Sequence, residues 1–244
     1  MGLEVVLLSS TQVFGAAPLA YARDLLAEHL AGCRTLHFAP FAMADHDAYT
    51  ARIAGLLAPF GVQTIGLHTL AARAAVEQAE AVFVGGGNTF RLLQALQRLD
   101  LLEPIGRRVL AGQLRYLGSS AGTNVACPSL RTTNDMPIVM PSSFEALGLV
   151  PFQINPHYLD PDPASTHMGE TREQRIEQFL EANDVSVLGL REGAWLRRQD
   201  QRLVLGGIAR SRLFQRGQAP RDLDPGADVS WLLQIQPRFD TPRP

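Results

Sequence analysis

Short aliphatic segments alternate with longer amphipathic segments along most of this chain, and this alternation constrains the fold more than any other feature. The segments expected as strands are residues 4–9, 35–38, 63–66, 81–84, 115–118, 185–190 and 202–206. The segments with apolar residues at helical spacing are 18–30, 47–57, 89–99, 104–111 and 171–182. Alternating strands and helices form parallel βα units. The pattern predicts an α/β fold, with a mostly parallel sheet covered by helices on both faces.

No linker rich in Ser, Gly or Pro divides the chain, and no segment repeats, so we expect one domain over residues 1–244. Residues 216–244 are expected as an edge element or a loose extension of that domain. An open parallel sheet binds its ligand at the carboxyl ends of its strands. The segments that follow Val84, Gly118 and Leu190 are therefore the candidate site loops.

The charge balance excludes several kinds of partner. The chain has 22 Lys and Arg against 24 Asp and Glu, a formal net charge of -2, so no basic field favours a nucleic acid or an anionic membrane. No apolar run approaches the roughly 20 residues of a membrane-spanning helix. Cys33 and Cys127 are too few for a thiolate metal cluster, and residues 1–11 lack a secretory signal pattern. We expect a cytoplasmic protein.

The strongest motif is Gly118-Ser119-Ser120-Ala121-Gly122, which follows one predicted strand and precedes a helix-compatible segment. A G-x-S-x-G sequence in this setting forms a nucleophile elbow, because small neighbours allow a tight turn that exposes the serine hydroxyl. The next backbone N–H groups then point toward the reacting carbonyl oxygen. The alternative is a Gly/Ser turn that only joins a strand to a helix.

A second glycine-rich loop, Gly85-Gly86-Gly87-Asn88, follows the predicted strand at 81–84. Consecutive glycines let the backbone approach a ligand closely, so this loop is a candidate second half of an oxyanion hole, with donors at Gly86, Gly87 and Ala121. A phosphate-binding loop is less consistent with the sequence, because Phe90 stands where a dinucleotide fingerprint needs glycine. A plain turn stays open.

His157 is the favoured general base, because it ends a short apolar segment and follows the serine in the chain. His167 is its nearest rival. The acid that orients the base is open among Asp135, Asp160 and Glu192, each at a loop position, and a solvated loop carboxylate is the alternative for all three.

Taken together, several motifs resemble the peptidase E family, the α-aspartyl dipeptidases among the serine peptidases. They are GGGN at 85–88, SAGTNVACP at 120–128, RTTNDMP at 131–137, NPH at 155–157 and GETREQRI at 169–176. The resemblance implies a flavodoxin-like sheet related to class I glutamine amidotransferases. It also implies hydrolysis of dipeptides that begin with aspartate, by a serine nucleophile paired with a histidine. We expect this mechanism to need no metal or organic cofactor.

Ser120 and His157 fall on the matching motif positions. For the acid, the resemblance points to Asp135 first, with Glu192 as a competitor on geometric grounds. Selectivity for aspartate requires a cation near its carboxylate, and arginine offers a bidentate fork. Arg172, in the GETR segment, is the first candidate for that cation.

Arg131 is the alternative cation, and Asn88 is a further candidate for substrate binding. Two other functions stay open: a cyanophycinase-like peptidase of the same fold, and a catalytically silent module that binds a small molecule. The expected partner is a small peptide substrate, and the oligomeric state cannot be predicted.

Overall fold

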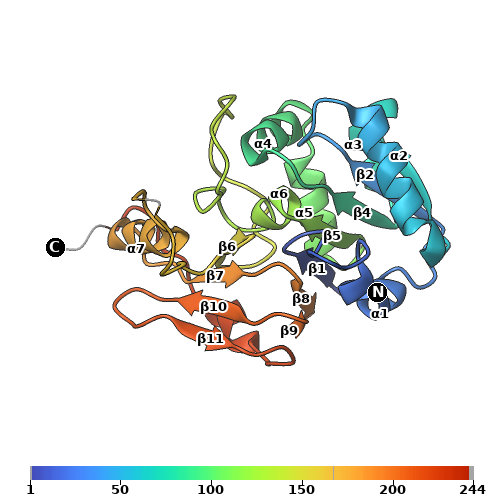
Figure 1. Cartoon of the computed structure of the whole chain (residues 1–244). Helices are drawn as coiled ribbons and strands as arrows, with labels where there is room; N and C mark the ends of the chain where they lie inside the picture. Colours follow the sequence, from blue (N-terminus) through green and yellow to red (C-terminus); the bar gives the residue numbers. More distant parts are fainter. Residues whose placement is uncertain (1, 167, 242–244) are drawn as a thin grey trace.

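A seven-stranded sheet forms the centre of the computed structural model, which describes residues 2–166 and 168–241 (Figure 1). The strand order is β3-β2-β4-β5-β1-β8-β9. Five strands are parallel: β1 (Glu4–Leu8), β2 (Thr35–Ala39), β3 (Gln63–Gly66), β4 (Ala81–Val84) and β5 (Arg115–Ser119). β8 (Ala194–Gln199) pairs antiparallel with β1, and β9 (Arg202–Gly207) pairs antiparallel with β8.

A second sheet of four strands lies beside the first, in the order β11-β10-β7-β6 (Figure 1). Its strands are β6 (Gln153–Pro156), β7 (Val187–Leu190), β10 (Ser211–Phe214) and β11 (Arg221–Leu223). β6 and β7 are parallel, so their carboxyl ends lie side by side, with Pro156 opposite Leu190. The predicted strand at 185–190 therefore exists, but it belongs to this second sheet.

Helices cover both faces of the central sheet, as the alternation along β1 illustrates. Val5 and Leu7 belong to one buried cluster and Val6 and Leu8 to another, because successive side chains of a strand point to opposite faces. The α-helices are α1 (Arg23–His29), α2 (His46–Leu57), α3 (Ala72–Gln78), α4 (Thr89–Arg98), α5 (Leu102–Leu110), α6 (Ala121–Asn124) and α7 (Arg172–Ala182). The 3-10 turns are Ala20–Ala22, Ala58–Phe60, Leu67–Thr69 and Ser230–Gln234. The predicted α/β fold is confirmed.

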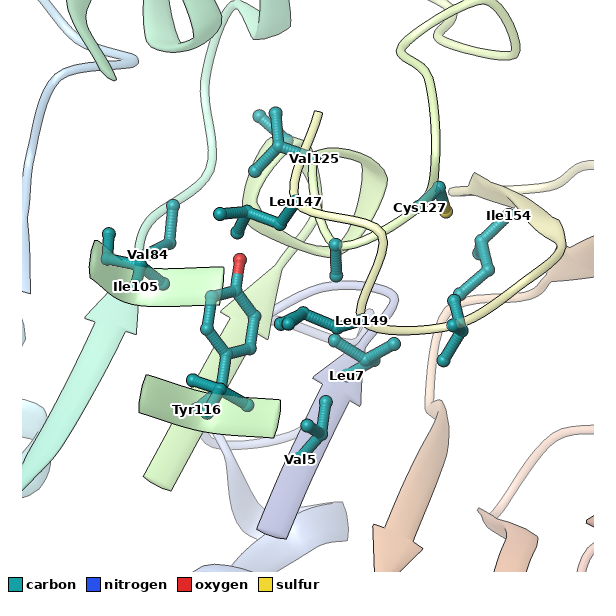
Figure 2. Close-up of a cluster of buried hydrophobic side chains, with 14 of the residues drawn as sticks. Val5, Leu7, Val84, Ile105, Tyr116, Val125, Cys127, Leu147, Leu149 and Ile154 are labelled. Carbon is teal, nitrogen blue, oxygen red and sulfur yellow. The ribbon is translucent and has the colours of Figure 1, made fainter. Parts of the chain in front are cut away.

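The larger buried cluster supports the turn after β5. Figure 2 shows Tyr116 among aliphatic side chains that include Leu7, Val84 and Leu149. The Tyr116 hydroxyl donates a 2.6 Å hydrogen bond to the carbonyl oxygen of Gly122, so a buried side chain of β5 fixes the first turn of α6. Burial raises the pKa of the Tyr116 hydroxyl.

Some predicted boundaries differ from the observed ones. The helix predicted at 18–30 begins as a 3-10 turn at Ala20, because Leu19 has a left-handed φ of 61° that keeps Pro18 out of the first turn. Pro104, in contrast, lies in the first turn of α5. α3, β6, β8, β10 and β11 were not predicted.

The C-terminal segment contributes β11 to the edge of the second sheet and then packs Val229 and Leu232 into the larger buried cluster. The backbone N–H of Thr241 donates to the carbonyl oxygen of Ala182, at the end of α7. Across residues 2–166 and 168–241, none of the helices has the length and apolar character to cross a membrane.

Candidate active site

Ser120 lies at the sharp turn between β5 and α6, with a left-handed φ of 53°. Its backbone N–H donates to Leu8, and its carbonyl accepts from Asn124, so the strained turn is held at both ends. The glycine at 122 is required by space, because a Cβ there would lie 1.9 Å from the carbonyl oxygen of Val84. The local geometry is that of a nucleophile elbow.

His157 follows β6 directly and also has a φ of 53°. Its backbone N–H donates a 2.9 Å hydrogen bond to the Oγ of Ser9, and the same hydroxyl donates to the carbonyl oxygen of Leu190 at 2.7 Å. Ser9 is fully buried and follows β1. One hydroxyl thus connects the central sheet, which carries Ser120, to the two strands that carry His157 and Glu192.

The side chains of Ser120, His157 and Glu192 form a continuous hydrogen-bonded relay. The His157 Nε2 lies 2.9 Å from the Ser120 Oγ, and the Nδ1 lies 2.7 Å from the Glu192 Oε1. A carboxylate on Nδ1 favours the tautomer that leaves Nε2 free to accept the serine proton. The arrangement can therefore activate Ser120 as a nucleophile.

The other candidate acids have different partners. The Oδ2 of Asp135 accepts hydrogen bonds from the backbone N–H and the hydroxyl of Thr89, at 2.7 and 2.6 Å. Asp160 accepts two hydrogen bonds from Arg191. The sequence placed Asp135 ahead of Glu192 as the partner of the base, and the observed contacts reverse that order. His167 lies outside the described residues.

The glycine-rich loop passes directly over the nucleophile. A Cβ at Gly86 would lie 3.0 Å from the Cβ of Ser120, so a larger residue there would crowd the serine. Burial raises the pKa of Tyr49, and the Gly86 backbone lowers it in part. Gly87, with a φ of 130°, and Ala121 line the pocket beside Ser120.

The pocket has a volume of about 490 Å³, within the range of small-ligand sites. Its lining residues are Gly87, Thr89, Ser120, Ala121, Thr133, Asn134, Asp135, Pro156, His157 and Arg172. Arg172 is half-buried at the start of α7, where Thr171 and Gln174 form a capping box. Burial lowers the pKa of Arg172, with Arg175 adding to this effect and Glu192 opposing it. Its buried Nη1 has no hydrogen-bond partner within the described part of the chain.

Arg131 and Asn88 have structural partners and do not line the pocket. Arg131 forms a bidentate ion pair with Asp240, at 2.7 and 3.0 Å. The side-chain oxygen of Asn88 caps α4 by accepting from the backbone N–H of Arg91, and its Nδ2 donates to the carbonyl oxygen of Met136. The structure brings Arg172 to the serine and leaves the other two outside.

Sequence reasoning missed Ser9, Thr89, Thr133 and Asn134 at this site. The available signal was their position: Ser9 ends the predicted strand 4–9, and Thr89 comes directly after the loop that follows the predicted strand 81–84. Both lie at the carboxyl ends of strands, where this fold binds ligands. Thr133 and Asn134 are adjacent to Asp135 within the motif at 131–137. Their small hydroxyl and amide side chains give no local catalytic signal, because they have no titratable group.

A serine on a strand-to-helix elbow, paired with a histidine and a carboxylate on an α/β sheet, defines a serine hydrolase site. The chain belongs to peptidase family S51, whose sequence profile matches residues 5–206. The family resemblance inferred from the motifs is thus confirmed.

Two sequence relatives extend over nearly the whole chain. One is Peptidase E of Streptomyces coelicolor, 57% identical over 240 residues, covering 98% of each chain. Another is a probable alpha-aspartyl dipeptidase of Drosophila melanogaster, 48% identical, covering 95% of this chain and 98% of that protein.

Solved structures share the fold at low identity. A putative peptidase E protein from Listeria monocytogenes EGD-e has a TM-score of 0.64 at 21% identity and covers 86% of this chain and 100% of its own. A peptidase from an acI-B1 Actinobacterium has a TM-score of 0.68 at 17% identity, covering 94% of this chain and 97% of its own.

Proposed function

We propose that this protein is a serine-type dipeptidase that hydrolyses dipeptides with an N-terminal aspartate. The observation that carries the proposal is the relay from Ser120 through His157 to Glu192, whose serine and histidine line one pocket with Arg172. The buried Nη1 of Arg172 has no hydrogen-bond partner among residues 2–166 and 168–241. Two of the relatives bear the names Peptidase E and probable alpha-aspartyl dipeptidase, which agree with that chemistry.

The reaction proceeds through an ester of Ser120. His157 takes the serine proton as the Oγ attacks the carbonyl carbon of the aspartyl residue, and the backbone N–H groups of Gly87 and Ala121 stabilise the oxyanion. His157 then gives its proton to the departing amine. Water, deprotonated by the same imidazole, hydrolyses the ester and releases aspartate, and Glu192 stabilises the imidazolium in both halves.

Arg172 provides the selectivity for aspartate. A substrate carboxylate that enters the pocket loses water, and without a cation this loss would prevent binding. The buried Nη1 of Arg172 is available to a carboxylate oxygen, and arginine binds carboxylates in a planar fork. Neutral side chains gain nothing from this cation, so Asn-Leu and Leu-Leu are poor substrates.

The test is hydrolysis of Asp-Leu, Glu-Leu, Asn-Leu and Leu-Leu by the purified protein and by Ser120→Ala, with EDTA present throughout. We expect cleavage of Asp-Leu alone, unaffected by the chelator and abolished in the variant. Full activity in Ser120→Ala would contradict the serine mechanism. Cleavage of β-Asp-Arg in preference to Asp-Leu would favour the cyanophycinase-like alternative, and no cleavage at all would favour the silent binding module.

A further inference from the structure

Asp135 lines the active-site pocket, yet it plays no part in the relay that the structure shows. Its Oδ2 accepts from the N–H and hydroxyl of Thr89, the first residue of α4, and its own N–H donates to the hydroxyl of Thr133. These donors are neutral. No positively charged side chain pairs with Asp135 anywhere in residues 2–166 and 168–241.

The pocket therefore contains two charges of opposite sign that form no ion pair within residues 2–166 and 168–241. Arg172 is the cation, also without an ion-pair partner among the described residues, and Asp135 is the anion. An N-terminal aspartyl residue carries the complementary pair, a side-chain carboxylate and an α-ammonium group, on adjacent carbon atoms. A half-buried carboxylate forms a stronger hydrogen bond to a charged donor than to a neutral one, and the ammonium group of the substrate is such a donor.

Asp135 is also held in a fixed position. The loop that contains it is attached along α4, where Asn88 donates to the carbonyl of Met136 and Gln94 to the carbonyl of Met140. Asn134 donates to the carbonyl of Pro156, the residue before the catalytic histidine. A rigid carboxylate at a defined place relative to Ser120 can fix the end of a substrate, which a solvated loop carboxylate cannot.

We propose that Asp135 is the binding site for the α-ammonium group of the substrate, and that it makes the enzyme specific for an unblocked amino terminus. This inference rests on the proposed dipeptidase function and adds a second recognition point to Arg172. With both charges bound, the peptide carbonyl, which is attached to the same carbon as the ammonium group, is presented to Ser120. A longer peptide with its aspartate inside the chain has no ammonium group to offer and is excluded.

The experiment compares Asp-Leu with N-succinyl-leucine, which is the same molecule without the α-amino group. Each is assayed with the wild-type protein and with Asp135→Asn, in which the remaining oxygen can still accept from Thr89. Loss of one charged hydrogen bond should lower kcat/KM for Asp-Leu about 10- to 100-fold in the variant. The value for N-succinyl-leucine should stay within about twofold of wild type.

A matched control is Asp24→Asn, which removes the same charge from an exposed position on α1 outside the pocket. It should change kcat/KM for neither substrate. An equal fall on both substrates in Asp135→Asn would overturn the proposal, because Asp135 would then act through structure or chemistry. Unchanged kinetics on both would overturn it as well.

Binding of the product, aspartate, tests the ammonium site independently of whether the protein hydrolyses dipeptides. Calorimetry with aspartate and with succinate needs no turnover, so it remains informative if Asp-Leu is not cleaved. Asp135→Asn should weaken the binding of aspartate at least tenfold and leave the binding of succinate unchanged. If aspartate and succinate bind equally well to the wild-type protein, the ammonium site is refuted whatever the protein hydrolyses.

Discussion

Replacing Glu192 by glutamine tests the relay most directly, since it keeps the shape of the side chain and removes its charge. The 2.7 Å contact to the Nδ1 of His157 would then join a neutral amide to the ring. Two effects reduce the rate: the imidazolium that forms during the reaction loses its counter-charge, and an amide N–H directed at Nδ1 favours the wrong tautomer.

The size of the expected fall in kcat follows from how exposed the His157 and Glu192 side chains are. Unit charges about 4 Å apart interact by about 4 kcal/mol at an effective dielectric constant of 20, and by about 1 kcal/mol in water. The His157 and Glu192 side chains are 34% and 49% exposed, so an intermediate value of about 2–3 kcal/mol applies. With loss of tautomer control added, kcat should fall about 10²- to 10³-fold, less than the roughly 10⁴-fold loss known for a buried triad aspartate.

The assay is the steady-state hydrolysis of Asp-Leu by Glu192→Gln, with Glu177→Gln on the exposed side of α7 as the control. The fall should appear in kcat and leave KM little changed, because Glu192 does not line the pocket. If Glu192→Gln keeps more than about a third of wild-type kcat, Glu192 does not orient the base. If Asp135→Asn then loses kcat on both Asp-Leu and N-succinyl-leucine, Asp135 takes that role.

Arg172→Met should lower kcat/KM for Asp-Leu about 10²-fold, while Arg131→Gln, whose partner lies outside the pocket, should stay within about twofold of wild type. Ser9→Ala should lower kcat about tenfold and leave the far-ultraviolet circular dichroism unchanged, and Ser9→Thr should recover part of the lost activity. If Ser9→Ala is as active as wild type, Ser9 does not position His157. Burial lowers the pKa of His29, so below about pH 6.5 the unfolded chain takes up a proton that the folded chain resists. Stability in urea should therefore fall by up to about 1.4 kcal/mol per pH unit between pH 6.5 and 5.5, and His29→Gln should reduce that slope.

The central strands were predictable because they are buried on both faces. Val5 to Leu8 and Ala81 to Val84 are continuous apolar runs, as parallel strands under two helical layers must be. The missed strands have a different composition. β8 carries Arg197 and Arg198, and β11 carries charged residues at a sheet edge, so neither shows the apolar run that marks a buried strand. A local sequence pattern cannot distinguish such charged strands from loops, whether the strand is internal like β8 or at a sheet edge like β11.

The elbow was predictable for a local reason, since a tight turn needs its small residues adjacent in sequence. Gly118, Ser120 and Gly122 are within five residues, and their spacing alone indicates the geometry. The identity of the acid depends on which strands pair, which no local pattern contains. Asp135 is closer to the elbow in sequence, and Glu192 is closer to the base in space.

The parallel pairing of β6 with β7 is what brings His157 and Glu192 together. Pro156 lies opposite Leu190, so the histidine one residue beyond β6 and the glutamate two residues beyond β7 leave the sheet side by side. Ser9 then joins these two strand ends to β1, whose carboxyl end supports the elbow through the carbonyl of Leu8. His157 and Glu192 thus leave the second sheet at neighbouring strand ends, and the buried hydroxyl of Ser9 hydrogen-bonds both ends to the strand that supports the elbow. A change at Ser9 should therefore disturb the contact between Ser120 and His157 more than the contact between His157 and Glu192.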